Sequence, residues 1–179
     1  RAALSRGLAL GAGGAALLLT LRALWLFDPS KAGLQLVERH PWIPTLHADY
    51  AVGMDGLSAL MLLLSALIVP VAIIAGWKRD EDARLSSMLY LVLQAGLFGV
   101  FTAQSFFHWF IFWEVVLIPA FFLVRAAGTV GAKRAALKFL LTTLVGSVAM
   151  LLAFQAMLLA AGTLDFAELA HLGRNGGLG

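Results

Sequence analysis

Five long apolar blocks, separated by shorter polar segments, limit what this sequence can fold into. They cover residues 8–27, 56–77, 85–103, 105–124 and 137–161. A helix needs about 20 mostly apolar residues to cross the hydrocarbon core of a bilayer. The blocks are far longer than strands and lack the alternation of apolar and polar residues that strands show. The sequence therefore predicts an all-α fold, a polytopic transmembrane helix bundle with five membrane-spanning helices.

The blocks divide the chain into four regions. We expect a first transmembrane helix within residues 1–27, an external loop over 28–55, four transmembrane helices over 56–161 with Glu114 at mid-membrane, and an external segment over 162–179. The first block is not typical of a signal peptide, because it is too long and Arg22 interrupts its end. Since the chain begins with Arg1 and not with Met, we expect it to be a fragment of a longer protein.

Composition excludes several classes of function. Charged residues make up only 13% of the chain, against about a quarter of a soluble domain. The chain has no cysteine, so disulfides and thiolate chemistry are excluded. The net charge is +3, and the basic residues are scattered between apolar blocks. We therefore expect the lipid bilayer as surroundings and no nucleic-acid partner.

The basic residues also predict an orientation, because Lys and Arg concentrate in cytoplasmic loops. With a cytoplasmic N-terminus, nine of them lie on the cytoplasmic side: Arg1, Arg6, Lys78, Arg79, Arg84, Arg125, Lys133, Arg134 and Lys138. Four lie on the other side: Arg22, Lys31, Arg39 and Arg174. We expect the N-terminus of this chain to be cytoplasmic.

The polar segments themselves carry weak signals. The external loop over residues 28–55 contains three prolines and is expected to be ordered, with a short extended piece. His40 and His47 lie in it and could ligate a metal, but their spacing without a carboxylate pattern favours surface histidines. The basic segment over residues 128–138 could attract anionic lipid headgroups, but control of topology is the favoured explanation.

One acidic residue stands inside an apolar block, in the stretch HWFIFWEVVLIPAFFLV over residues 108–124. Glu114 is near the middle of its block and therefore near the bilayer midplane. An ionised side chain at that depth costs at least about 2.5 kcal/mol. Apolar surroundings disfavour the charged carboxylate and a nearby cation favours it, so such a group can bind and release a proton. The alternative is a protonated Glu114 that only hydrogen-bonds to a neighbouring helix.

The residues that could support Glu114 are few. Arg125 lies about 16 Å along the same helix, and Lys138 opens the next block from the same side, so neither contacts Glu114. We expect its cationic partner in another subunit or in a part of the protein that this chain lacks. Pro119 frees a backbone carbonyl, which could hold a water beside Glu114 or be a tolerated membrane-helix proline. His108 could relay protons, or be an interfacial histidine without a special role.

Other polar residues in the blocks indicate packing. The fifth block carries a small, polar stripe made of Thr142, Thr143, Gly146 and Ser147. Small residues let helices approach closely, and hydrogen bonds to a water chain are the lesser alternative. Gln94 and Gln155 are further candidates for buried polar groups. Asp55 precedes the second block and is suited to cap its helix.

Three stretches together resemble one family. They are DGLSALMLLLSALIVPVAI over residues 55–73, FIFWEVVLIPAFFLV over residues 110–124, and AALKFLLTTLVGSVAMLLA over residues 135–153. In this order they are similar to the N-terminal part of the antiporter-like membrane subunits of complex I (NADH:quinone oxidoreductase), most of all to the M-type subunit. The resemblance implies a fold of about fourteen transmembrane helices with two inverted repeats. The family commonly has Trp-Gly after Val124, where this chain has RAAGTVG.

The resemblance also implies a site and partners. The Glu of the family's W-E-x-x-L-I-P motif corresponds to Glu114, and in the family it interacts with a lysine on the seventh helix, which would follow residue 179. We expect no cofactor in this chain. NADH or another donor, flavin, iron–sulfur clusters and quinone belong to partner subunits, and neighbouring antiporter-like subunits are further partners. The expected location is a bacterial inner membrane or an organellar energy-transducing membrane.

Two other classes of function stay open. One is a subunit of a multisubunit cation/proton antiporter, a membrane-bound hydrogenase or an inorganic-carbon-uptake complex. The other is a structural membrane subunit without proton transfer. A stand-alone enzyme is not expected, because the sequence shows no metal cluster, nucleotide loop or nucleophile–base arrangement.

Overall fold

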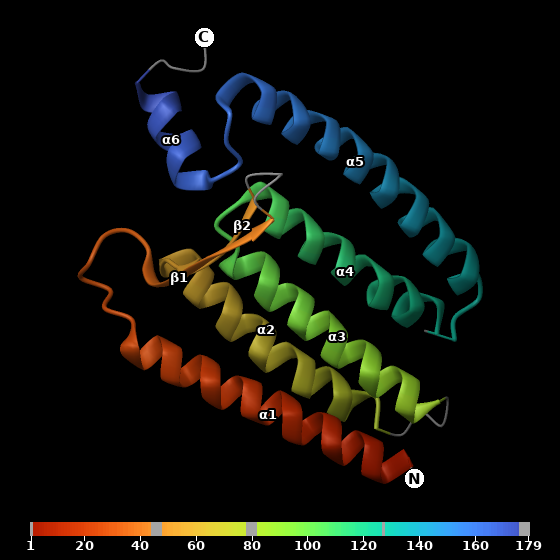
Figure 1. Ribbon diagram of the computed structural model, residues 1–179. Coiled ribbons are helices and arrows are strands. Elements are labelled where there is room, and N and C mark those ends of the chain that lie inside the picture. The colour runs from red at the N-terminus through yellow and green to blue at the C-terminus, as the bar shows by residue number, and fades with distance from the viewer. Residues whose placement is uncertain (1, 44–47, 78–81, 127, 176–179) are drawn as a thin grey trace.

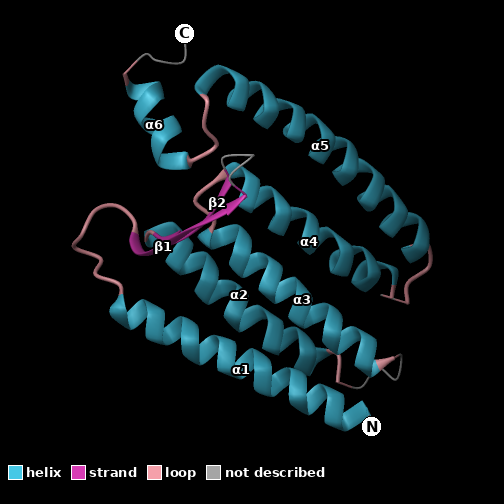
Figure 2. Cartoon of the chain, viewed as in Figure 1, coloured by secondary structure: helices cyan, strands magenta, loops and turns pink. Residues whose placement is uncertain are grey.

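A computed structural model describes residues 2–43, 48–77, 82–126 and 128–175. The elements are α1 (Ala2–Leu26), β1 (Gln35–Ile43), β2 (Ala48–Met54), α2 (Gly56–Ala75), α3 (Ala83–Thr102), α4 (Phe106–Arg125), α5 (Ala132–Ala161) and α6 (Phe166–Arg174). The five helices α1 to α5 are each long and apolar enough to cross a membrane. This confirms the predicted helix bundle, with a β-hairpin and a short helix added to it (Figure 2).

The long helices lie side by side in chain order and alternate in direction (Figure 1). The hairpin and α6 lie at one end of the bundle, which we call the hairpin end. The N-terminus lies at the other end, which we call the N-terminal end. The hairpin lies within the predicted external loop and provides its extended piece: β1 and β2 pair antiparallel, with His40 opposite Tyr50.

The predicted helix bounds agree within a few residues except at the starts of the first and fifth blocks. Helix α1 begins at Ala2, before the predicted start at residue 8. Helix α5 begins at Ala132, directly after Gly131, whose φ of 87° is left-handed. Lys133, Arg134 and Lys138 are therefore in its first two turns and not in a linker. Long basic side chains can extend from a helix to a polar interface, so basic residues can occupy the first turns of a membrane helix. A prediction that begins the helix at the first residue of the apolar run therefore places its start too late.

Capping residues fix where two of the helices start. The Asp55 carboxylate accepts hydrogen bonds from the Ser58 backbone N–H at 2.8 Å and the Ser58 hydroxyl at 2.7 Å. The Ser105 hydroxyl accepts the His108 backbone N–H at 3.3 Å. Each of these backbone bonds satisfies one of the donors that a helix leaves unpaired in its first turn. The predicted capping role of Asp55 is confirmed.

We expect Asp55→Ala to lower the free energy of unfolding by about 1 kcal/mol at neutral pH. The bonds from Ser58, its hydroxyl first, lower the folded-state pKa of Asp55 from the ordinary 3.8. A lowered pKa means that this stabilisation is fully present above pH 3.8 and is lost as the pH falls through the folded-state pKa. In thermal unfolding, the difference in melting temperature between wild type and Asp55→Ala should become smaller below pH 3.8. A difference that does not change with pH would contradict this prediction.

Helices α3 and α4 approach each other most closely at two glycines of α3. A Cβ atom added at Gly96 would lie 2.6 Å from Val116 Cγ2, and one added at Gly99 would overlap the Phe112 ring. Both α4 side chains therefore occupy space that any larger residue on α3 would fill. These contacts set the rotation of α4 about its axis, and with it the direction in which Glu114 points.

Candidate functional site

The hairpin end holds the start of α4 through backbone hydrogen bonds from distant segments. The Gln104 N–H donates to the Ala51 carbonyl of β2 at 3.0 Å. The Phe106 N–H donates to the Leu164 carbonyl at 2.9 Å, and the Phe166 N–H donates to the Gln104 carbonyl at 3.0 Å. The turn between α3 and α4 is thus fixed on both sides, by β2 and by the segment that leads into α6.

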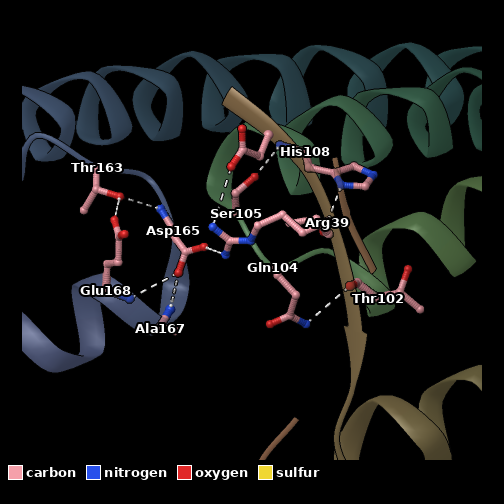
Figure 3. Close-up of polar contacts among 11 residues, drawn as sticks. Arg39, Thr102, Gln104, Ser105, His108, Thr163, Asp165, Ala167 and Glu168 are labelled. Atoms are coloured by element: carbon pink, nitrogen blue, oxygen red, sulfur yellow. Dashed lines mark hydrogen bonds and ion pairs between the residues drawn. The ribbon is translucent and has the colours of Figure 1, made fainter. Parts of the chain in front are cut away.

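An ion pair joins the hairpin to α6 (Figure 3). Arg39 of β1 contacts the carboxylate of Asp165, and its guanidinium lies 3.6 Å from Asp49 of β2. The Asp165 carboxylate also caps α6, because it accepts the backbone N–H groups of Ala167 at 2.9 Å and Glu168 at 3.2 Å. The Asp165 side chain is only 11% exposed, so solvent screens this pair less than an ordinary surface pair.

We expect Asp165→Ala to destabilise the hairpin end by about 1–2 kcal/mol. Helix α6 loses its cap, and Arg39 loses its less exposed partner. Hydrogen-exchange mass spectrometry should show faster exchange of the Ala167 and Glu168 amides. Asp49→Ala is the matched control, since it removes a contact to Arg39 but no cap. Equal exchange in both variants would contradict the capping role.

His108 lies beneath the hairpin. Its side chain is 1% exposed, and its Nδ1 lies 3.1 Å from the Ala51 carbonyl, to which it donates when that nitrogen carries the proton. The rings of Tyr50 and Phe112 flank it, each with a centroid 5.0 Å away. The hairpin therefore covers His108. Both interpretations of this residue, an interfacial histidine without a special role and a proton relay, stay predictions.

Glu114 lies near the middle of α4. Its Oε1 is buried, and no hydrogen-bond partner for it lies within the described part of the chain. Phe112 and Val116 of α4 face the two glycines of α3. Each is two residues from Glu114, a turn of about 200° around the helix, so Glu114 points away from α3. A buried carboxylate oxygen without a hydrogen bond costs free energy, which is unusual for a side chain that serves only packing.

The residues predicted to support Glu114 lie apart from it. Arg125 is the last residue of α4 and is exposed, about 16 Å along the helix axis. Pro119 is buried, and its five-residue spacing turns it about 140° away from Glu114. The carbonyl that Pro119 frees belongs to Val115, on the side of α4 that faces α3. These positions do not favour a water held jointly by that carbonyl and Glu114.

The aromatic contact between α4 and α5 gives the depth of Lys138. Phe154 of α5 packs on the rings of Phe106 at 4.2 Å and Phe110 at 6.1 Å, and is therefore level with residue 108. From that level, Glu114 lies about 9 Å towards the N-terminal end and Lys138 about 24 Å, at 1.5 Å per residue. Lys138 is exposed and about 15 Å from Glu114 in depth, as predicted from the sequence.

Some of the other polar candidates have hydrogen-bond partners in the described part of the chain, and others do not. The Thr143 hydroxyl donates to the Phe139 carbonyl of its own helix at 2.8 Å, and Gln155 is exposed. Gln94 and Ser147 are each 3% exposed, and neither Gln94 Nε2 nor Ser147 Oγ has a partner in the described ranges. The prediction of a buried Gln94 is confirmed. The sequence did not distinguish Ser147 from its neighbours, because hydroxyl partners depend on helix rotation.

The predicted metal alternative has no support at the residues that the structure describes. Among them, no group of three or more His, Cys, Asp or Glu side chains could hold a metal ion. His40 is exposed and lies 3.1 Å from Glu38, which fits a surface histidine. His47 lies outside the described residues.

Comparisons with known proteins agree with this geometry. The family described as "NADH:quinone oxidoreductase/Mrp antiporter, TM" matches residues 103–177, which include Glu114. A chain 4 of NAD(P)H-quinone oxidoreductase from Microcystis aeruginosa is 42% identical over 80% of this chain and 26% of its own length. The chain is thus similar to membrane subunits of the complex I type. This confirms the resemblance found in the sequence.

Two further relatives define the breadth of this antiporter-like group. Subunit M of the F(420)H(2) dehydrogenase from Methanosarcina mazei is 42% identical over 75% of this chain and 27% of its own length. A chain of respiratory complex I from Thermus thermophilus has the same fold, with a TM-score of 0.79 and 34% identity over 92% of this chain and 34% of that chain. The chain spans about a quarter of the length of the curated relatives it matches.

Proposed function

We propose that this chain is part of a proton-translocating antiporter-like subunit of a complex I type oxidoreductase, and that Glu114 is its proton-responsive group. The observation that carries the proposal is the buried, unpartnered Oε1 of Glu114, within the described part of the chain, at the middle of a membrane-spanning helix. Acidic residues within transmembrane segments are expensive and mark ion or proton pathways. Homology to antiporter-like subunits supports the same assignment.

The proposed mechanism pairs Glu114 with a lysine outside residues 1–179. Protons reach and leave the buried site through hydrated half-channels. While the ion pair is closed, the carboxylate of Glu114 stabilises the ammonium form of the lysine. When the pair opens, this stabilisation is lost and the lysine releases its proton to the next acceptor. A driving event in neighbouring subunits biases the pair between the two arrangements.

The proposed surroundings follow from the same assignment. The N-terminus faces the cytoplasm, which places the basic residues Arg125 and Lys138 at the cytoplasmic end of α4 and α5. The partners are other membrane subunits of one complex, including antiporter-like neighbours, in a bacterial inner membrane or an organellar energy-transducing membrane. Electron donor, flavin, iron–sulfur clusters and quinone are held by those partners.

Replacement of Glu114 tests the proposal. Proton translocation by the intact complex is measured in sealed vesicles, for wild type and Glu114→Gln, with assembly checked in both. Loss of translocation in an assembled complex supports the proposal. Unchanged translocation assigns Glu114 a structural role, as a neutral group that hydrogen-bonds within the membrane.

A second candidate function is a subunit of a cation/proton antiporter complex. The matching family includes Mrp antiporters together with NADH:quinone oxidoreductases. The chain itself does not separate the two, because the donor-oxidising chemistry would be in soluble partners. Purification of the complex from its native membrane distinguishes them: co-purified flavin and iron–sulfur subunits indicate an oxidoreductase, and their absence from an active complex indicates an antiporter.

A further inference from the structure

Three buried polar atoms have no hydrogen-bond partner in the described part of the chain: Gln94 Nε2 on α3, Glu114 Oε1 on α4 and Ser147 Oγ on α5. A polar atom buried in this way costs about 1–3 kcal/mol of desolvation free energy that no bond returns. Helix α4 packs against both α3 and α5. The Gln94 side chain lies beside Gly13 of α1, which leaves Ser147 of α5 as the candidate to accompany Glu114.

Ser147 and Glu114 lie at nearly the same depth. Phe154 is level with residue 108 of α4, as its ring contacts with Phe106 and Phe110 show. Ser147 precedes Phe154 by seven residues on the antiparallel helix, so it lies about 10 Å towards the N-terminal end. Glu114 lies about 9 Å in the same direction. Their difference in depth is thus roughly one residue of helical rise.

Ser147 also faces α4. The buried residues of α5 form one stripe along the helix, made of Ala132, Ala136, Ser147 and Phe154. Phe154 packs into the aromatic side chains at the start of α4. Seven residues are nearly two full turns, so Ser147 lies on the same face of α5 as Phe154. Its burial to 3% exposure agrees with a position in the seam between the two helices.

The hydroxyl of Ser147 is available to a neighbouring helix. Serine in a membrane helix often donates to a carbonyl of its own helix one turn earlier. Ser65 of α2 does so, with its hydroxyl 2.8 Å from the Met61 carbonyl. The Ser147 hydroxyl makes no such bond within the described residues. A hydroxyl can both donate and accept a hydrogen bond, so one group can serve a carboxylate and a protonated carboxyl.

We propose that Ser147 is a positioning residue for Glu114, whose carboxyl group it hydrogen-bonds through one bridging water in the seam between α4 and α5. The inference rests on the proposed function of Glu114 and adds a second residue to its machinery. The water donates to the ionised carboxylate and accepts from the protonated form, while Ser147 fixes its position. A water with at least two polar partners is stable in such a buried site.

The test removes the hydroxyl alone. In the intact complex, Ser147→Ala should slow proton translocation about fivefold and shift the carboxyl stretching band of Glu114 in infrared difference spectra. Ser65→Ala is the matched control, because Ser65 is also a buried serine in a membrane helix but its hydroxyl bonds within its own helix. Loss of that hydroxyl should change neither the rate of proton translocation nor the position of the Glu114 band. Unchanged translocation and an unshifted band in Ser147→Ala would overturn the inference.

A second pair of variants covers any loss of packing. Ser147→Thr keeps the hydroxyl, whereas Ser147→Val has the shape of the Thr variant with a methyl group in place of that hydroxyl. The inference predicts the wild-type band position in the Thr variant and a shifted band in the Val variant; identical spectra of the two would contradict it. The Glu114→Gln variant separates failure of the proposed function from failure of the inference about Ser147. Normal proton translocation in Glu114→Gln would contradict the proposed function. Lost translocation in Glu114→Gln, with translocation and band position unchanged in Ser147→Ala, would contradict only the inference about Ser147.

Discussion

Proton translocation by the intact complex should fall by about 100-fold, to the passive leak, when Glu114 is replaced by Gln. Glutamine keeps the shape of the side chain and can still hydrogen-bond through its amide group, but it cannot release a proton or carry a negative charge. It therefore cannot form an ion pair with a lysine. The measurement is acidification of sealed vesicles, followed with a pH-sensitive dye and normalised to the amount of assembled complex.

Two glutamates outside the membrane provide matched controls. Glu38 and Glu168 are exposed at the hairpin end, and the same Glu→Gln change there should leave translocation within about twofold, since exposed polar positions contribute little. Translocation by Glu114→Gln at the level of these controls would show that the carboxylate of Glu114 is not needed for proton movement.

The second large effect is expected at the contact between α3 and α4. Gly99→Val should destabilise the helix pair by about 3 kcal/mol, the upper part of the range for an overpacked core. The added side chain overlaps the Phe112 ring, so the ring or helix α4 must move to admit it. We expect a lower melting temperature of the purified complex and a lower yield of assembled subunit.

Gly11→Val in α1 is the control for this change. A Cβ atom at Gly11 meets nothing within 4 Å in the described part of the chain, so the variant reports the intrinsic effect of valine in a helix. Equal melting temperatures for Gly99→Val and Gly11→Val would contradict the role assigned to the close approach of the two helices.

The five long helices were predictable from the sequence because each contains a continuous apolar run. The Asp55 cap of α2 and the isolated Glu114 were found from the same pattern. Helices α1 and α5 begin earlier than predicted, because polar or basic residues lie in their first turns. Contacts between distant segments gave no such signal: Arg39 and Asp165 are 126 residues apart, and neither stands out by its neighbours in the chain.

The surroundings of two candidate residues also depended on tertiary structure. His108 is buried because the hairpin lies over it, with Ala51 57 residues away in the chain. Ser147 is distinguished from Thr143 only by the rotation of α5, which turns one hydroxyl into the seam with α4 and lets the other bond to its own helix. A sequence pattern identifies such residues as polar, and packing decides what they contact.

The most direct test of the central claim is whether Glu114 changes its protonation state during turnover. Infrared difference spectroscopy of the intact complex, in wild type and Glu114→Gln, measures the stretching band of a protonated carboxyl group as the complex is driven through turnover. We predict that a band present in the wild-type difference spectrum is missing from that of the variant. Identical spectra would show that Glu114 keeps one protonation state throughout, and would contradict the account.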